Sequence, residues 1–73
     1  MLDKIVILGA GESGCGTAIL GKKQGWEVFV SDQGTISKSA RNTLDDLGIE
    51  WEEETHTLSR MQDAQYIIKS PGI

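Results

Sequence analysis

Apolar residues along this chain form short β-like runs separated by stretches of helical spacing. The first run, residues 3–8, alternates little and is rich in β-branched side chains, which predicts a buried parallel strand. Similar runs predict strands at residues 27–31, 49–51 and 66–69. The chain is therefore expected to contribute four strands to one sheet.

The stretches between these runs carry helical signals. Small and apolar residues make a narrow stripe within residues 12–24, and Gly25 is a natural helix stop. Apolar residues recur at helical spacing over 36–47, and Gly48 closes that segment. A capping threonine predicts a short third helix over 57–63.

The order of elements is strand–helix repeated, ending on the fourth strand. Alternating elements with right-handed crossovers predict an α/β fold, a three-layer Rossmann-like domain with a parallel sheet. The expected strand order is 3-2-1-4, with helices on both faces and a switch point between strands 1 and 4.

Composition limits the function classes. The chain has 73 residues, 38% hydrophobic and 25% charged, which suits one small globular domain. The net charge of −4 argues against a nucleic-acid partner, and no apolar run approaches a membrane span. One cysteine excludes an internal disulfide, and the N-terminus has no signal-peptide pattern, so we expect a cytoplasmic protein.

A glycine-rich loop follows the first predicted strand. Gly9 allows a tight turn, Gly11 lets a phosphate approach the backbone, and Gly14 lets the next helix pack closely. An acid, Asp32, ends the second strand. This layout is typical of a nucleotide site, with the phosphates at the helix N-terminus. The alternatives are a tight turn without a ligand and a helix-capping role for Asp32.

The loop, the strand-end pair Ser31-Asp32 and the segment Lys69-Ser70-Pro71-Gly72-Ile73 occur together. This combination resembles the N-terminal domain of the Mur ligases of peptidoglycan synthesis, in versions from Bacteroides-like bacteria. The resemblance covers essentially the whole chain. The glycine loop alone is weak, but its combination with the final segment is fairly specific.

The resemblance implies that this domain holds the UDP part of UDP-N-acetylmuramoyl-L-alanine. The loop would contact the diphosphate, Asp32 and Gln33 the uridine end, and the final loop the sugar and diphosphate. The implied substrate-binding residues are Gly11, Glu12, Ser13, Gly14, Asp32, Gln33, Ser70, Pro71 and Gly72. Relatives often have a hydroxyl residue where this chain has Gln33, and Glu12 is expected to act through its backbone.

The resemblance also implies an ATP-dependent ligase that adds D-glutamate to this substrate, in cell-wall synthesis and hence cell shape and division. The ATP and magnesium sites belong to a central domain, and much of the D-glutamate site to a C-terminal one. Residues 1–73 are thus expected to be the N-terminal domain of a longer, monomeric enzyme, with no catalytic residue, no metal ligand and no activity alone.

Two rival functions remain open. A redox or regulatory domain could bind NAD or FAD in the same loop, with Asp32 on the adenosine ribose. The segment Ser70–Ile73 distinguishes the two possibilities, because a domain that binds NAD or FAD has no need for it. The other rival is an interaction module that binds no nucleotide.

The remaining chemistry-bearing residues are expected to be structural. Cys15 is read as a packed small residue rather than a reactive thiol, and the lone His56 as solvated. Trp26 and Trp51 are read as packing residues. The acids interpreted as a solvated strand edge are Glu50, Glu52, Glu53 and Glu54.

Overall fold

The computed structural model describes residues 3–69 and contains one parallel four-stranded sheet with helices on one face. Its elements in chain order are β1 (Lys4–Leu8), α1 (Glu12–Lys23), β2 (Glu27–Ser31), α2 (Lys38–Asp46), β3 (Glu50–Glu52), the 3₁₀ turn η1 (Leu58–Arg60) and β4 (Tyr66–Lys69). The strand order is β3-β2-β1-β4, so the predicted fold class and order are confirmed.

The sheet register sets the four strand ends level with one another. Leu8 pairs with Ser31 on one side and with Lys69 on the other, and Ser31 pairs with Glu52. These four residues end β1, β2, β4 and β3. The loops that leave the strands therefore start along one edge, where α/β proteins bind ligands.

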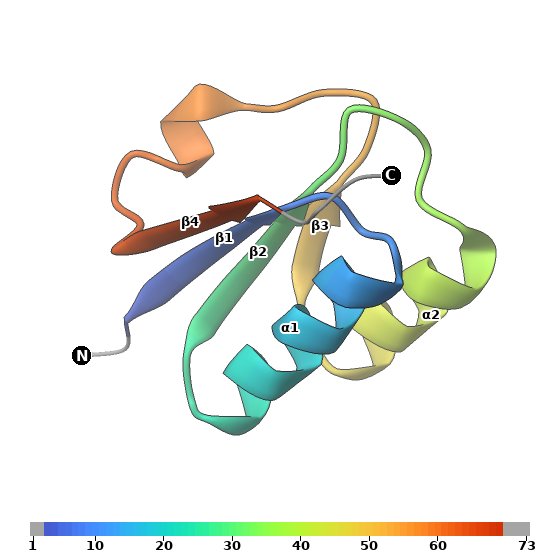
Figure 1. The fold of residues 1–73 in the computed structure, drawn as a ribbon, viewed down its shortest axis with the longest axis horizontal. Coiled ribbons are helices and arrows are strands. Elements are labelled where there is room, and N and C mark those ends of the chain that lie inside the picture. Colours follow the sequence, from blue (N-terminus) through green and yellow to red (C-terminus); the bar gives the residue numbers. More distant parts are fainter. Residues whose placement is uncertain (1–2, 70–73) are drawn as a thin grey trace.

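The two faces of the sheet are covered differently (Figure 1). Helices α1 and α2 lie side by side on one face, and the 53–65 segment with η1 crosses the other. The core under the helices is formed by Ile5, Ile7, Ala10, Ala18, Val28, Val30, Ile36, Leu44 and Ile49. A smaller cluster on the other face consists of Val6, Phe29 and Met61.

The predicted helix over 57–63 is shorter than expected. Only Leu58–Arg60 is helical, as a 3₁₀ turn. The polar groups of this segment bond elsewhere: the Thr57 backbone N–H and hydroxyl donate to Glu52, and Lys4 Nζ donates to the Arg60 carbonyl at 2.6 Å. Bonds to Glu52 at the end of β3 and to Lys4 of β1 have replaced the i→i+4 ladder, so the second face has a single helical turn.

Strand β4 lies at the outer side of the sheet formed by the described residues. It pairs with β1, and its apolar side chains Tyr66, Ile67 and Ile68 are all exposed. The Tyr66 ring lies 5.4 Å from that of Trp26. β4 thus presents apolar surface that nothing within residues 3–69 covers.

Candidate functional site

The glycine loop between β1 and α1 is built as the sequence predicts. Gly9 has a φ of 106°, which favours glycine, and its N–H donates to the Ser31 carbonyl at 2.8 Å. A Cβ on Gly14 would lie 1.9 Å from the Gly9 carbonyl oxygen. The close packing expected at Gly14 is therefore against the loop itself, and it brings the start of α1 over the end of β1.

Gly11 is the open position of this loop. It is exposed, its φ of −70° suits any residue, and a Cβ added there would meet nothing within 4 Å. The protein's own packing therefore does not require glycine at this point. Glycine here keeps the backbone open to an incoming group.

The first turn of α1 directs backbone donors to the same place. Gly11 is the N-cap and makes no side-chain capping hydrogen bond, and the first helical bond runs from Cys15 N–H to the Gly11 carbonyl. The N–H groups of Glu12, Ser13 and Gly14 precede that bond. Glu12 and Ser13 are exposed, so this turn offers donors and a positive helix end to an anion.

Asp32 holds two loops together at the end of β2. Its Oδ2 accepts the Ala10 N–H and its Oδ1 accepts the Gly34 N–H, both at 2.8 Å. The acid therefore closes its own turn and fixes the glycine loop, rather than capping a helix. A carboxylate has about four acceptor sites, so two remain for a ligand. The neighbouring Gln33 is exposed.

A hollow of about 370 Å³ opens beside the glycine loop, between the N-terminal halves of α1 and α2. Its lining residues are Ala10, Gly11, Glu12, Cys15, Gly16, Ile19, Ser37, Ser39, Ala40 and Thr43. Two predicted site residues, Gly11 and Glu12, are among them. Asp32 and Gln33 are not, so the structure does not gather all the predicted residues into one hollow.

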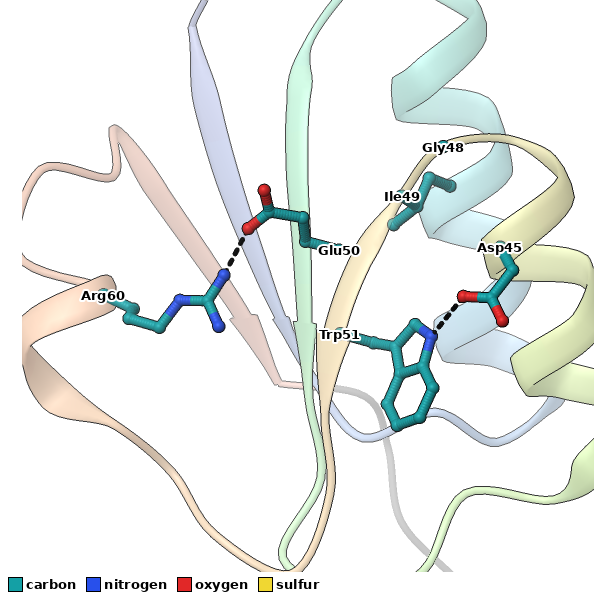
Figure 2. Close-up of a pocket in the computed structure, with 6 residues that line it drawn as sticks. All are labelled: Asp45, Gly48, Ile49, Glu50, Trp51 and Arg60. Atoms are coloured by element: carbon teal, nitrogen blue, oxygen red, sulfur yellow. Dashed lines mark hydrogen bonds and ion pairs between the residues drawn. The ribbon is translucent and has the colours of Figure 1, made fainter.

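A larger hollow, of about 460 Å³, straddles the edge strand β3 away from the glycine loop (Figure 2). On one side Arg60 pairs with Glu50, and on the other Trp51 Nε1 donates to Asp45 at 2.8 Å. Its ionic groups are thus already partnered. Trp51 also packs against the core, as expected of a packing residue.

The predicted residues Ser70, Pro71 and Gly72 lie outside the described residues. The last described residue, Lys69, is exposed and pairs with Leu8 at the end of β1. The glycine loop and the end of β4 therefore leave neighbouring strands, as the predicted switch point requires.

Sequence reasoning missed a polar cluster at the same edge, formed by Ser31, Glu52 and His56. Ser31 is fully buried, and its Oγ lies 2.7 Å from Glu52 Oε2 and 2.6 Å from His56 Nδ1. The expectation of a solvated His56 is wrong, because the ring is half-buried and bonded. Ser31 and Glu52 pair in the sheet register, which the sequence does not show, and the predicted third strand ends at residue 51.

The interpretation of the acids in and after β3 as a solvated edge also needs correction. Glu53 accepts the Ile36 N–H at 2.9 Å. Burial pushes the pKa of Glu52 upward, but hydrogen bonds from Thr57 and Ser31 and the charge of Arg60 together bring that pKa below its usual value. Glu52 is therefore an ionised, structural acceptor. Glu50 and Glu52 do lie in an edge strand, as expected, whereas Glu53 and Glu54 follow it.

Cys15 is packed rather than activated. Its Sγ donates to the Ala10 carbonyl at 3.3 Å, and burial raises the pKa of the thiol above its ordinary value. Position in the first turn of α1 does not outweigh burial here.

Within residues 3–69, no cluster of three or more histidine, cysteine, aspartate or glutamate side chains is arranged to hold a metal ion. Among the same residues no helix has the length and apolar character to cross a bilayer.

Comparison with known proteins agrees with the resemblance drawn from the motifs. The family model described as "MurD N-terminal domain" matches residues 4–73. Curated relatives named UDP-N-acetylmuramoylalanine--D-glutamate ligase come from Christiangramia forsetii (57% identical over 100% of this chain), Bacteroides thetaiotaomicron (50% over 99%) and Bacteroides fragilis (47% over 99%). The chain spans 16% of the length of each. These names lend no support to the NAD or FAD alternative.

Proposed function

This chain belongs to the MurD N-terminal domain family, and we propose that it binds the UDP part of UDP-N-acetylmuramoyl-L-alanine within an ATP-dependent ligase that adds D-glutamate. The observation that carries the proposal is the open Gly11 position beside the first turn of α1. Backbone donors meet there with no side chain in the way. The names of the relatives supply the substrate class.

The proposed pose follows the chemistry of these groups. The diphosphate lies against the N–H groups of Glu12, Ser13 and Gly14, where charge-assisted hydrogen bonds are strong. The uridine end lies toward Asp32 and Gln33, and the sugar toward Ser70, Pro71 and Gly72. Binding energy from this end of the substrate positions a carboxylate that reacts elsewhere.

The chain acts, in this proposal, as the N-terminal domain of a longer, cytoplasmic, monomeric enzyme. Two observations support a longer protein: the chain spans 16% of its relatives, and β4 exposes apolar side chains. ATP and Mg²⁺ are assigned to parts of the enzyme beyond these residues, where ATP would activate the substrate carboxylate for attack by the D-glutamate amine. Residues 1–73 alone should then release no phosphate from ATP.

The test is calorimetric titration of the full-length protein with UDP-N-acetylmuramoyl-L-alanine and, separately, with NAD. We expect the UDP ligand to bind more tightly. Tighter binding of NAD would overturn the proposal in favour of a dinucleotide site.

A matched pair of variants locates the site. Gly11→Ala adds one methyl group where a phosphate should approach, and Gly16→Ala adds the same group five residues further along, where it also meets nothing within 4 Å. Gly11→Ala should weaken UDP-substrate binding about ten- to a hundredfold, the value of one charge-assisted hydrogen bond. Gly16→Ala should leave it unchanged. Equal affinities for both variants would mean that the loop is only a turn.

A further inference from the structure

The polar cluster Ser31–Glu52–His56 joins the loops that follow β2 and β3. Ser31 Oγ has three neighbours: Glu52 Oε2 at 2.7 Å, the Thr55 carbonyl at 3.0 Å and His56 Nδ1 at 2.6 Å. The Ser31 side chain is fully buried at the end of β2. Such a buried hydroxyl is costly unless its bonds are satisfied together.

Counting protons determines the state of His56. The Ser31 hydroxyl has one proton, and neither an ionised Glu52 nor the Thr55 carbonyl has a proton to donate. If this proton went to His56 instead, both oxygens would lie against the Ser31 oxygen with no proton between them, so the arrangement that satisfies most groups directs the hydroxyl proton to these oxygens. The short contact to His56 is then a hydrogen bond only if Nδ1 carries a proton and donates it to Ser31 Oγ.

This cluster supports the residues of the candidate site directly. The Ser31 carbonyl accepts the Gly9 N–H of the glycine loop at 2.8 Å. The Asp32 N–H donates to the Glu52 carbonyl at 3.1 Å, and the Asp32 carbonyl accepts the Thr55 N–H at 3.3 Å. The backbone on both sides of Asp32 is thus fixed by the segment that holds His56.

We propose that His56 is a positioning residue for substrate binding, which acts by donating from Nδ1 to Ser31 and so holds Asp32 and the glycine loop in their binding geometry. This inference rests on the proposed function, because the ligand held by Asp32 is the UDP-linked substrate. His56 itself contacts no reacting atom in this scheme.

The first test compares variants of the full-length enzyme under steady-state conditions. His56→Leu keeps bulk but removes the donor, and we expect KM for UDP-N-acetylmuramoyl-L-alanine to rise about tenfold, with kcat and KM for ATP unchanged. His56→Asn retains an N–H near the place of Nδ1 and should return KM to within about twofold of the wild type. Thr55→Ala, at the exposed neighbouring side chain, is the control and should change nothing.

The outcomes separate the two proposals. If the wild-type protein does not bind the UDP ligand in calorimetry, the proposed function fails and the positioning role fails with it. If the wild type binds but His56→Leu has an unchanged KM, or His56→Asn rescues nothing, only the role of His56 is overturned. A fall in kcat together with a rise in both KM values would also overturn it, since that combination indicates a structural defect alone.

A spectroscopic test observes the tautomer of His56 directly in the wild-type protein. Nitrogen NMR of ¹⁵N-histidine-labelled wild-type protein in mildly alkaline buffer should show His56 protonated at Nδ1 and unprotonated at Nε2. Ser31→Ala should remove this preference, and His56→Asn assigns the signal by its loss. A wild-type His56 protonated at Nε2 alone would overturn the inference.

Discussion

Gly14 and Gly16 lie only two residues apart in the same helix, yet the same substitution should have opposite effects at the two. A methyl group on Gly16 meets nothing within 4 Å, so Gly16→Ala gains only helix propensity, about 0.5–1 kcal/mol. A methyl group on Gly14 would lie 1.9 Å from the Gly9 carbonyl oxygen and 2.9 Å from the Gly9 carbonyl carbon. These are backbone atoms, so no side-chain rotation can relieve the contact.

The effect of Gly14→Ala on stability combines a packing cost with a gain in helix propensity. Overpacking a tight contact costs about 1–3 kcal/mol, and more where backbone must move. Gly14→Ala should therefore destabilise the start of α1 despite its gain in propensity. Since both variants gain the same helix propensity, they should differ by the packing cost alone, roughly 1–3 kcal/mol or more in the local free energy of opening, which is about fivefold or more in an equilibrium constant.

Native-state hydrogen exchange of the α1 amides in the full-length protein measures this local opening free energy. We expect protection to rise in Gly16→Ala and to fall in Gly14→Ala. Equal or greater protection in Gly14→Ala would refute the close approach of helix and loop. Because Gly14 is constrained by the protein itself, it is a poor probe of the ligand, and Gly11 is the better one.

Three further predictions concern groups outside the glycine loop. The pKa of Glu52 is lowered in the folded protein, so its contribution to stability is present above the usual glutamate pKa and is lost as pH falls through the folded-state pKa. Between these two pKa values, the free energy of unfolding should depend less on pH in Glu52→Gln than in the wild type, as acid unfolding curves would measure. Because burial raises the pKa of Cys15, iodoacetamide at pH 8 should alkylate it more slowly in the folded than in the denatured protein, and equal rates would contradict the packing. Trp51→Phe removes the exposed hydrogen bond from Nε1 to Asp45, so it should lower the free energy of unfolding in denaturant by about 0.5–1.5 kcal/mol. A much larger decrease would mean that the indole ring contributes more than this one bond.

The sheet and the glycine loop could be predicted because both depend on local patterns. Apolar runs identify parallel strands, and the right-handed crossover rule then leaves few strand orders. Glycine is also required at two positions of the loop for structural reasons: Gly9 has a positive φ, and Gly14 approaches the backbone closely. These properties need no knowledge of the rest of the fold.

The segment after β3 could not be predicted in the same way. Its capping threonine suggests a helix, yet Thr57 donates to Glu52 and Lys4 reaches the Arg60 carbonyl from β1. These partners are separated along the chain by up to 56 residues. Helical periodicity contains no information about such bonds, so the sequence favoured a helix where the structure has a single 3₁₀ turn.

Asp32 shows how a structural and a functional interpretation of one residue can both hold. Its two carboxylate oxygens each accept one backbone N–H, from Ala10 and from Gly34, which fixes the orientation of the group before any ligand arrives. A carboxylate held in this way loses little further conformational entropy on binding, which favours affinity through preorganisation. Since each oxygen retains an acceptor site, the bonds that make Asp32 structural also prepare it to receive a donor from the uridine end of the proposed substrate.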